Sequence, residues 1–556
     1  MEKMIAVGTD IFDDFIKGNS YYIDKTELIY ELAAKTRNKV TLFTRPRRFG
    51  KTLMMSMLES FFSIQKGDSR DVFAGLDIMK HEAFCDEWMN QYPVLFLTLK
   101  DVEGNNYDIA FGKLKAVLAD LCKKHEKIVE NPKVDPADAE TFKKLMFQTA
   151  GEVEVRNALK TIMRMMMTVY GKPVILLIDE YDAPLAKAQE TKNKEFYRDM
   201  LDVIYGILSI SLKTNEFLKL AVVTGCLKIS NESIYSGVNN VVGYSVTDQK
   251  FSQYFGFTQN EVGKMLDVFE LSDKMDVIKE WYDGYIFGKT EVFCPWDVAN
   301  YLVEVMDDEE AMPGDYWADN SSNAILNDFV NHSKIDASEK FETLLNGGTI
   351  TEDISEGITY GHIADSEKNL WSALLMMGYV SKADKVSSKG KVRLRIPNAE
   401  IADIFKDCVV DRFKRTMNAS DVDAFVTAMW NKDEKTASEM LSEILWNSIS
   451  YFNYEEEYYH GIMNGIFTSR GFIPDLGVEA GLGRLDIRIR DQGKRSAILM
   501  EFKRSKRKEN LDADCDKAIA QIFEYGYDKK LPEGYEHQLI YGIAFYAKMA
   551  KVKFAR

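Results

Sequence analysis

The sequence has few cysteines, and none of them is spaced to form a familiar framework. The six cysteines lie far apart along 556 residues, without a C-x-x-C pair. This argues against a cysteine zinc cluster and a disulfide-rich secreted fold, and it is typical of proteins from a reducing compartment. No apolar run approaches the roughly 20 residues that span a bilayer, and the N-terminus shows no secretion signal. We therefore expect a soluble, cytoplasmic protein without membrane contact.

Positive charge is scarce over the chain as a whole. The 71 Lys and Arg residues are outnumbered by 87 Asp and Glu residues, which gives a formal net charge of -16. Such a surface repels nucleic acid unless basic residues gather in one place. They do so between residues 484 and 508, where ten Lys and Arg residues stand against three Asp and Glu residues. This stretch is the part of the chain best suited to a phosphate backbone.

The chain also lacks repeats and low-complexity linkers, but its apolar pattern changes along its length. From about residue 20 to 255, short apolar runs alternate with helical patterns, which predicts an α/β fold with a mostly parallel sheet. Four runs are too apolar to have a solvent-exposed face, and we expect them to be central strands of the sheet. They are Val40–Thr44, Pro93–Leu99, Val174–Ile178 and Leu218–Thr224.

Two further regions are expected after this first domain. Residues 256–435 are predicted to form a helical or winged-helix-like middle region, in which Thr258 and Glu261 are placed to cap a helix. Leu394–Glu400 has the pattern of a strand that leads into another helix. Residues 436–556 are predicted to form a C-terminal α/β domain, so that the expected domains are 1–255, 256–435 and 436–556.

The first strand-like run leads into a candidate phosphate-binding loop that lacks its usual first glycine. The loop ends in Gly50-Lys51-Thr52, but Arg45 stands where the G-x-x-x-x-G-K-[ST] pattern begins. Gly50 permits close backbone approach, Lys51 suits the β- and γ-phosphates of ATP, and the Thr52 hydroxyl suits Mg²⁺. An apolar strand precedes the loop and a helical pattern follows it, as anion binding at a helix N-terminus requires. The sequence therefore predicts an ATP site despite Arg45.

Polar residues at the ends of two later runs suit the same site. Asp179 is placed to hold Mg²⁺, and Glu180 is placed to polarise the water that attacks the γ-phosphate. Thr224 suits contact with the γ-phosphate or its water, although a plain strand end explains it nearly as well. The basic candidates for compensating phosphate charge are Arg45, Arg47, Arg48 and Lys228.

The basic stretch near the C-terminus contains a second candidate site. Gly483–Arg490 and Ser496–Lys503 have the pattern of two strands joined by a turn at Gly493. Because strand side chains alternate between faces, Glu501 and Lys503 share one face, and Asp486 lies in the facing strand. Two carboxylates and a lysine in this arrangement suit one or two Mg²⁺ or Mn²⁺ ions and a water that attacks a phosphodiester. On the residues alone, a surface hairpin with solvated charges remains an alternative.

Helical patterns on either side of the hairpin add further candidates. Gln521 lies on a helix whose apolar stripe can pack on the sheet, so we expect it beside the site. Glu456 lies on a helical pattern before the hairpin and is a candidate metal ligand. His460 lies one helical turn after Glu456, although a lone histidine is more often structural than a ligand.

Taken together, these motifs resemble the AAA-ATPase-like proteins that carry a C-terminal PD-(D/E)XK nuclease domain. The resemblance extends over nearly the whole chain, and the family loop itself reads Arg-Pro-Arg-Arg-Phe-Gly-Lys-[Ser/Thr], so Arg45 fits it. It implies a P-loop ATPase joined to a restriction-endonuclease-like fold. The resemblance implies that the residues binding the nucleotide are Arg47, Arg48, Phe49, Gly50, Lys51, Thr52, Asp179 and Thr224. It implies that Asp486, Glu501 and Lys503 form the core of the nuclease site, with Glu456 and Gln521 on flanking helices. One difference is Lys228, which stands where the family usually has arginine.

Several functions remain open at this point. The first is an ATP-hydrolysing protein coupled to a Mg²⁺-dependent nuclease that acts on nucleic acid, with DNA as the expected substrate. The second is a nucleotide-driven switch or nucleic-acid-binding module whose nuclease-like domain does not cut. A third, less favoured, is an ATPase that acts on protein partners. A homo-oligomer is also compatible with the sequence, because many related ATPases complete their site with an arginine from a neighbour.

Overall fold

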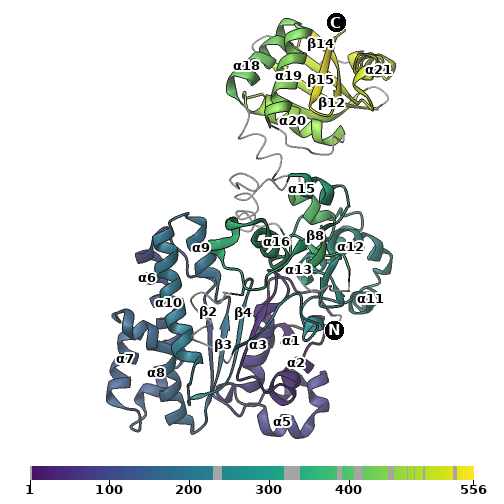
Figure 1. Cartoon of the computed structure of the whole chain (residues 1–556). Coiled ribbons are helices and arrows are strands. Elements are labelled where there is room, and N and C mark those ends of the chain that lie inside the picture. Colours follow the sequence, from purple (N-terminus) through teal and green to yellow (C-terminus); the bar gives the residue numbers. More distant parts are fainter. Residues whose placement is uncertain are drawn as a thin grey trace. The chain divides into compact units, whose positions relative to one another are not determined.

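The chain forms two units, which Figure 1 shows in a computed structural model. The first unit comprises residues 1–325 and 349–402, and the second comprises residues 326–348 and 403–556, so the chain passes between them three times. The structure describes residues 3–228, 241–317, 338–384, 391–405, 408, 418–448, 456–472, 474–480, 483–491, 495–529 and 535–555.

The first unit is built on a parallel sheet of five strands in the order β2-β3-β4-β1-β5. This confirms the predicted α/β fold with a parallel sheet. The strands are β1 (Val40–Thr44), β2 (Val94–Thr98), β3 (Val174–Asp179), β4 (Leu218–Gly225) and β5 (Val241–Tyr244). The helices around them are α1 (Phe12–Lys17), α2 (Glu27–Tyr30), α3 (Lys51–Phe62), α4 (Arg70–Phe73), α5 (Glu82–Trp88), α6 (Tyr107–Lys124), α7 (Pro136–Met146), α8 (Glu152–Tyr170), α9 (Ala183–Glu190) and α10 (Lys194–Leu212).

The expectation that all four apolar runs are central strands is wrong for β2, which lies at one edge of the sheet. Figure 1 shows α6, α8 and α10 on one side of the sheet and α1 and α3 on the other. Because helices cover both faces, an edge strand of such a sheet is as apolar as a central one. Apolar composition therefore predicted the strand but not its place in the order.

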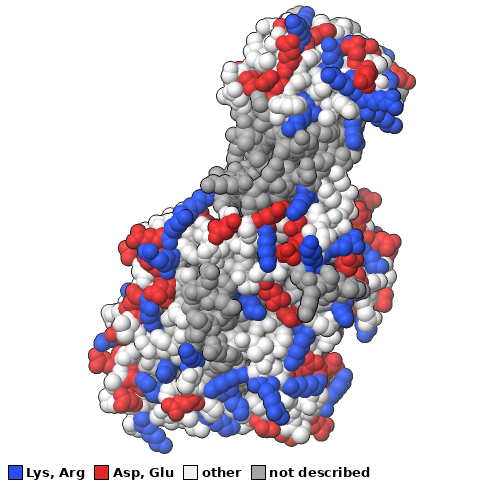
Figure 2. Space-filling view, in the orientation of Figure 1, with Lys and Arg blue, Asp and Glu red and all other residues white. Residues whose placement is uncertain are grey.

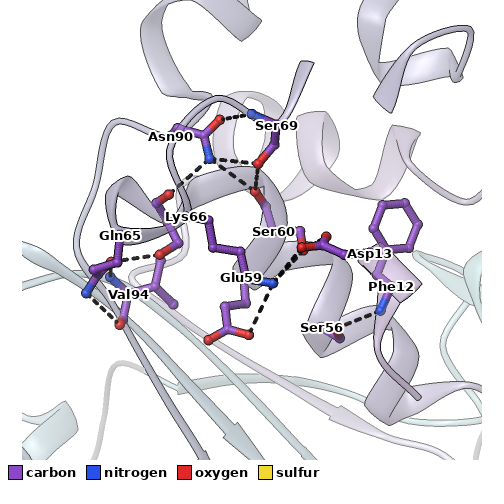
Figure 3. Close-up of polar contacts among 11 residues, drawn as sticks. Phe12, Asp13, Ser56, Glu59, Ser60, Gln65, Lys66, Ser69, Asn90 and Val94 are labelled. Carbon is purple, nitrogen blue, oxygen red and sulfur yellow. Dashed lines mark hydrogen bonds and ion pairs between the residues drawn. The ribbon is translucent and has the colours of Figure 1, made fainter. Parts of the chain in front are cut away.

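Helix α3, which follows the candidate phosphate loop, is held in place by side-chain hydrogen bonds (Figure 3). The Ser56 hydroxyl accepts a hydrogen bond from the backbone N–H of Phe12 at 2.9 Å. Nearer the end of the helix, Asn90 Nδ2 donates to the carbonyl of Ser60 at 3.2 Å and to that of Ser63 at 3.0 Å. These contacts tie α3 to α1 and to the loop before β2, and so fix the helix that begins at Lys51.

The rest of the first unit is called here the accessory part (residues 245–317 and 349–402). It contains α11 (Gln259–Val268), α12 (Met275–Tyr282), α13 (Pro295–Asp307), α16 (Glu367–Met377), the hairpin of β6 (Tyr285–Phe287) and β7 (Thr290–Val292), and an antiparallel sheet of β8 (Ile350–Asp353), β10 (Lys391–Arg395) and β9 (Ser381–Lys382). The predicted helix cap is confirmed, because Glu261 accepts from the Thr258 N–H at 2.7 Å while the Thr258 hydroxyl accepts from the Glu261 N–H. The predicted strand at Leu394 is also confirmed, and residues 399–405 after it are helical.

The second unit contains a mixed five-stranded sheet in the order β11-β12-β13-β14-β15, in which only β13 and β14 are parallel. The strands are β11 (Pro474–Ala480), β12 (Gly483–Asp491), β13 (Ser496–Arg504), β14 (His537–Tyr546) and β15 (Met549–Phe554), and the helices are α15 (Ser338–Leu345), α18 (Ala419–Asn431), α19 (Glu434–Ser448), α20 (Glu456–Thr468) and α21 (Leu511–Glu524).

Helices cover both faces of this second sheet. Met500 and Phe502 point toward α18, α19 and α20, whereas α21 packs on the opposite face through Leu511 and Cys515. The predicted hairpin is confirmed, since β12 and β13 pair antiparallel. Gly493, expected in its turn, lies outside the described residues.

Candidate functional sites

The phosphate loop curls around the side chain of Lys51. Its ammonium donates to the carbonyls of Arg45 at 3.1 Å and Pro46 at 2.7 Å. Gly50 has φ +78° at the start of α3, a left-handed conformation that glycine adopts without strain. The Thr52 hydroxyl donates to Asp179 Oδ2 at 2.8 Å. The loop and the end of β3 therefore meet, as the sequence predicts.

The ends of β3 and β4 are joined at the same place. The Thr224 hydroxyl donates to Asp179 Oδ1, and the Glu180 N–H donates to the Thr224 oxygen at 3.3 Å. Asp179 is fully buried between these hydroxyls. Burial raises the pKa of Glu180, an effect that nearby Lys51 opposes. Asp179, Glu180 and Thr224 thus form one cluster beside the loop.

The side chain that replaces the first loop glycine points away from the loop. Arg45 is fully buried, and its Nη1 donates to the carbonyls of Thr44 at 2.8 Å and Tyr244 at 3.0 Å. Its guanidinium lies over the Phe255 ring, 4.8 Å from the centroid, and 5.4 Å from that of Phe287. Burial lowers the pKa of Arg45 to about 9. Arg45 anchors the loop to the accessory part.

Other loop side chains make the same kind of contact. The Phe49 ring is buried against Tyr285 and Phe287, with centroids 5.0 Å away in both cases. Arg48 lies over the Trp296 ring at 4.9 Å. These contacts limit a role for Phe49 at the nucleotide to its backbone, because its side chain is enclosed by other rings.

Pro46 also packs on the accessory part, against Gly378. A Cβ at Gly378 would lie 3.0 Å from Pro46 Cβ, and the glycine has φ +90°. A side chain at this position would therefore be strained in its backbone and crowded by the loop. Glycine at the end of α16 lets the accessory part approach the phosphate loop closely.

Arg47 is the loop arginine that lies beside the catalytic candidate. Burial lowers the pKa of Arg47, but neighbours that include Cys226 and Glu180 raise it by more, so it stands above its ordinary value. Lys228, by contrast, is paired with Glu356 at 3.6 Å. Arg47 therefore lies within electrostatic reach of Glu180, whereas Lys228 is engaged with Glu356.

The second candidate site lies on the hairpin of the second unit. The register pairs Ile487 with Met500, so the next residues, Asp486 and Glu501, face each other on the side of the sheet that α21 covers. Asp486 Oδ2 accepts a hydrogen bond from the Phe502 N–H at 2.7 Å. Lys503 Nζ lies 3.6 Å from Glu501 Oε1. The structure therefore brings the predicted Asp, Glu and Lys together.

Helix α21 adds Gln521, whose amide nitrogen donates to Glu501 Oε1. The helix lies close to the sheet because Gly542 has no side chain; a Cβ there would lie 2.3 Å from the Cys515 carbonyl oxygen. Gly542 is the β14 partner of Glu501. Because Gly542 has no side chain, α21 can pack close enough for Gln521 to reach Glu501. This agrees with the expectation that the apolar stripe of the helix packs on the sheet and places Gln521 beside the site.

His460 joins this site, a placement that sequence reasoning alone did not favour. Its Nε2 lies 3.6 Å from Asp486 Oδ1, and its ring packs edge-on against Phe502 with centroids 4.9 Å apart. Burial raises the pKa of Asp486, and the nearby His460 acts in the opposite direction by lowering it. The spacing from Glu456 was the signal in the sequence, but it does not show which strand residue the histidine meets.

The carboxylate of Glu501 fits a metal ion. Its Oε2 is buried and has no hydrogen-bond partner among the described residues. Burial, and then the charge of Asp486, raises the pKa of Glu501 to about 7. Carboxylate oxygens are the ligands that Mg²⁺ and Mn²⁺ prefer. No group of three or more His, Cys, Asp or Glu side chains suited to a metal occurs within the described part of the chain, and the side chain of Glu456, the expected further ligand, lies outside it.

Several basic residues of the hairpin are engaged with acids, and others are exposed. Arg488 and Arg490 pair with Asp475 at 3.0 and 2.9 Å. A further group of exposed basic residues lies at the end of β13 and just after it and consists of Arg504, Lys506, Arg507 and Lys508. Figure 2 shows Lys and Arg side chains gathered on the second unit beside α21, with acidic side chains among them. Lys494 lies outside the described residues.

Comparisons with known proteins match the two regions separately. Residues 6–235 match the family described as "Predicted AAA-ATPase", and residues 454–555 match the PD-(D/E)XK nuclease superfamily. A protein of Azotobacter chroococcum mcd 1, described as an uncharacterized protein in the vnfD 5' region, is 24% identical over 412 residues, which is 74% of this chain and 70% of that protein. Among the helices described, none is long and apolar enough to cross a membrane.

Proposed function

We propose that this chain, whose residues 6–235 belong to the predicted AAA-ATPase family and whose residues 454–555 belong to the PD-(D/E)XK nuclease superfamily, binds and hydrolyses ATP and couples this to metal-dependent cleavage of DNA. The acidic chain concentrates its basic residues around the second site, which supports nucleic acid as the partner. DNA is the substrate that we propose.

The unpaired oxygen of Glu501 is the observation that carries the nuclease assignment. Leaving a buried acceptor without a partner costs about 1–3 kcal/mol, and more when it is charged. A cation held between Glu501 and Asp486 would offset this cost. A module that only binds DNA needs exposed basic residues and does not need a second carboxylate, Asp486, facing a buried carboxylate with an unpaired oxygen. The geometry therefore favours cleavage over the non-cleaving alternative.

At the nuclease site, each residue has a part that follows from its position. Asp486 and Glu501 would hold Mg²⁺ or Mn²⁺, which when bound neutralises the scissile phosphate and activates water. The Gln521 amide orients Glu501 through Oε1 and leaves Oε2 to the metal. Lys503, beside the same carboxylate, positions a phosphate oxygen or the attacking water. The exposed residues that follow β13 hold the DNA backbone.

At the nucleotide site, Lys51 exchanges its contacts with the Arg45 and Pro46 carbonyls for the β- and γ-phosphates. Thr52 and Asp179 would hold Mg²⁺, which would supply positive charge to neutralise the phosphates. Glu180 then orients the attacking water, and Thr224 and Arg47 lie where the γ-phosphate is expected. We infer that the movement of the loop is what reports nucleotide binding to the rest of the chain.

The test is a cleavage assay with the full chain, Mg²⁺ or Mn²⁺, and single- and double-stranded DNA and RNA, with and without ATP. Glu501→Gln should abolish cleavage and leave ATP hydrolysis intact, whereas Lys51→Ala should abolish hydrolysis. The matched control is Glu509→Gln, an exposed carboxylate close to the basic residues, which should cut as the wild type does. Cleavage by Glu501→Gln at the wild-type rate would refute the nuclease assignment.

Metal uptake separates the proposal from its alternative. Calorimetry should show Mn²⁺ binding that Glu501→Gln removes. DNA binding without metal uptake or cleavage would instead identify a module that does not cut, and cleavage of RNA alone would replace DNA as the substrate.

A further inference from the structure

Strand β3 ends at Asp179, and after Glu180 comes another acid, Asp182, which the proposed chemistry does not use. Asp182 is buried, and its Oδ2 accepts hydrogen bonds from the backbone N–H groups of Cys226 and Leu227, both at 2.9 Å. The preceding residue, Gly225, leaves room for it, because a Cβ there would lie 2.6 Å from Asp182 Oδ1. Asp182 therefore ties the end of β3 to the chain just after β4.

This tie lies next to the residues proposed to hydrolyse ATP. Glu180 has φ +50°, a conformation that is unfavourable for a residue with a side chain and persists only when its surroundings hold it. Its N–H is held by the Thr224 hydroxyl, and the Tyr181 N–H donates to the Thr224 carbonyl at 3.0 Å. The placement of Glu180 thus depends on how β3 and β4 are joined.

A residue of the accessory part completes the tie. The hydroxyl of Tyr360, which is buried, donates to the same Asp182 Oδ2 at 2.9 Å. Tyr360 begins a short helical turn, η7 (Tyr360–Asp365), 178 residues after Asp182. The chain has by then passed through residues 326–348 of the second unit and returned. Three donors from two parts of the chain therefore converge on one carboxylate oxygen.

We propose that Asp182 and Tyr360 are positioning residues of the ATPase site, through which the accessory part sets the rate of ATP hydrolysis. The inference rests on the proposed ATPase function. Neither residue belongs to the loop of Gly50, Lys51 and Thr52, although Tyr360 is an electrostatic neighbour of Arg47. Replacing the neutral Tyr360 side chain by phenylalanine leaves the charge of the site unchanged, so we expect nucleotide affinity to stay the same. What they control is the alignment of Glu180 and Thr224, on which only the chemical step depends.

Tyr360→Phe tests this, because it removes the hydroxyl and keeps the ring. Tyr197→Phe is the matched control, since the Tyr197 hydroxyl accepts from the Gly361 N–H at 3.2 Å and so holds the same turn without touching Asp182. The full-length variants are compared with the wild type by steady-state ATP hydrolysis, by binding of a fluorescent ATP analogue and by thermal unfolding. Lys51→Ala gives the background.

Tyr360→Phe should lower kcat about 10- to 100-fold, as small misplacements of a catalytic group do. The Kd of the fluorescent analogue should not change, and Tyr197→Phe should keep the wild-type kcat. A wild-type kcat in Tyr360→Phe overturns the inference while the proposed function stands. Equal losses in both variants overturn it as well, because they show that the turn is only structural. A wild type that hydrolyses no more ATP than Lys51→Ala overturns the proposed ATPase function and the inference with it.

Discussion

The two candidate sites differ in whether their functional groups already have partners. At the nucleotide site, Lys51 is bound by two loop carbonyls, and Thr52 and Thr224 both donate to Asp179. At the nuclease site, Glu501 Oε2 is buried and has no partner among the described residues. The first arrangement is stable by itself, whereas the second carries a cost that a cation would remove.

This difference indicates how each site responds to its ligand. In the proposed function, the phosphates of ATP replace the Arg45 and Pro46 carbonyls as partners of Lys51, so binding would remove two contacts that hold the loop. The loop packs on the accessory part through Arg45, Pro46, Arg48 and Phe49. Any movement of the loop would therefore change these contacts. A metal ion at Glu501 and Asp486 requires no such exchange. If the proposed functions are right, nucleotide binding would therefore change contacts of the loop, whereas metal binding would complete a carboxylate pair that is already in place.

The largest expected effect is a complete loss of cleavage when Glu501 is replaced. Glu501→Met removes the unpaired acceptor Oε2, but it also removes Oε1, which accepts from Gln521. Because these two effects oppose each other, the variant without metal should be within about 1 kcal/mol of the wild type in stability, although it no longer cuts DNA. Its thermal midpoint should not respond to Mn²⁺, which should raise that of the wild type. Differential scanning calorimetry with chelator and with Mn²⁺ measures both effects.

Asp514 is the matched control for this variant. It is also a buried carboxylate of the second unit, but its oxygens accept from Ser505 and Lys517, both at 2.7 Å. Asp514→Met should therefore lower stability. If both substitutions destabilise the metal-free protein alike, the contrast between paired and unpaired carboxylates is wrong.

The second prediction concerns Lys51. Lys51→Ala should weaken ATP binding about 10- to 100-fold, which corresponds to the loss of charge-assisted hydrogen bonds to phosphate. Lys39→Ala is the control, because the Lys39 ammonium also donates to a backbone carbonyl, that of Asn215 at 2.8 Å, just before β1. Titration with a fluorescent ATP analogue should separate the two, and equal affinities would show that Lys51 serves only the loop.

Much of the nucleotide site could be predicted because its signals are local. The loop at Gly50, Lys51 and Thr52 follows an apolar strand and opens a helix, and parallel strands bring Asp179 to the same edge. The hairpin of β12 and β13 was predictable for a similar reason, since alternation alone places Glu501 and Lys503 on one face.

Contacts between distant parts of the chain could not be predicted in this way. The sequence offers Arg45 as a candidate phosphate ligand, yet its guanidinium lies over the ring of Phe255, which is far away in the sequence. Tyr360 has no motif that points to Asp182, and His460 meets Asp486 only because α20 packs beside β12. Such pairings depend on the packing of whole elements, which residue spacing does not encode.

The third prediction returns the missing glycine to the loop. Arg45→Gly should lower the free energy of unfolding by about 2–4 kcal/mol, because it removes the contacts with the Thr44 and Tyr244 carbonyls and with the Phe255 ring. ATP affinity should fall rather than rise. Arg37→Gly, an exposed arginine shortly before β1, is the control for denaturant unfolding. An Arg45→Gly variant that is fully stable and binds ATP more tightly would mean that Arg45 does not anchor the loop.

The smallest expected effect is a pH dependence of the free energy of unfolding, caused by two carboxyl groups of the accessory part near Arg48. Asp297 and Glu400 are fully buried, and Glu400 accepts from the Trp317 N–H at 2.6 Å. Burial raises the pKa of both carboxyls, and Arg48 opposes the rise at Asp297. A raised pKa means that the folded chain binds the proton more tightly than the unfolded chain does. The protonated pair therefore stabilises the fold at low pH, and this stabilisation is lost as the pH rises through the pKa of the folded pair.

The free energy of unfolding should therefore fall by about 1 kcal/mol between pH 6 and pH 8, a modest slope for one shared proton. Asp297→Asn cannot titrate and should flatten this dependence. Asp307→Asn, an exposed aspartate at the end of the same helix α13, should keep it. Denaturant unfolding at each pH gives the measurement. A slope that is unchanged in Asp297→Asn would assign the pH dependence to other groups, and the carboxylate pair near Arg48 would then have no part in how the loop is held.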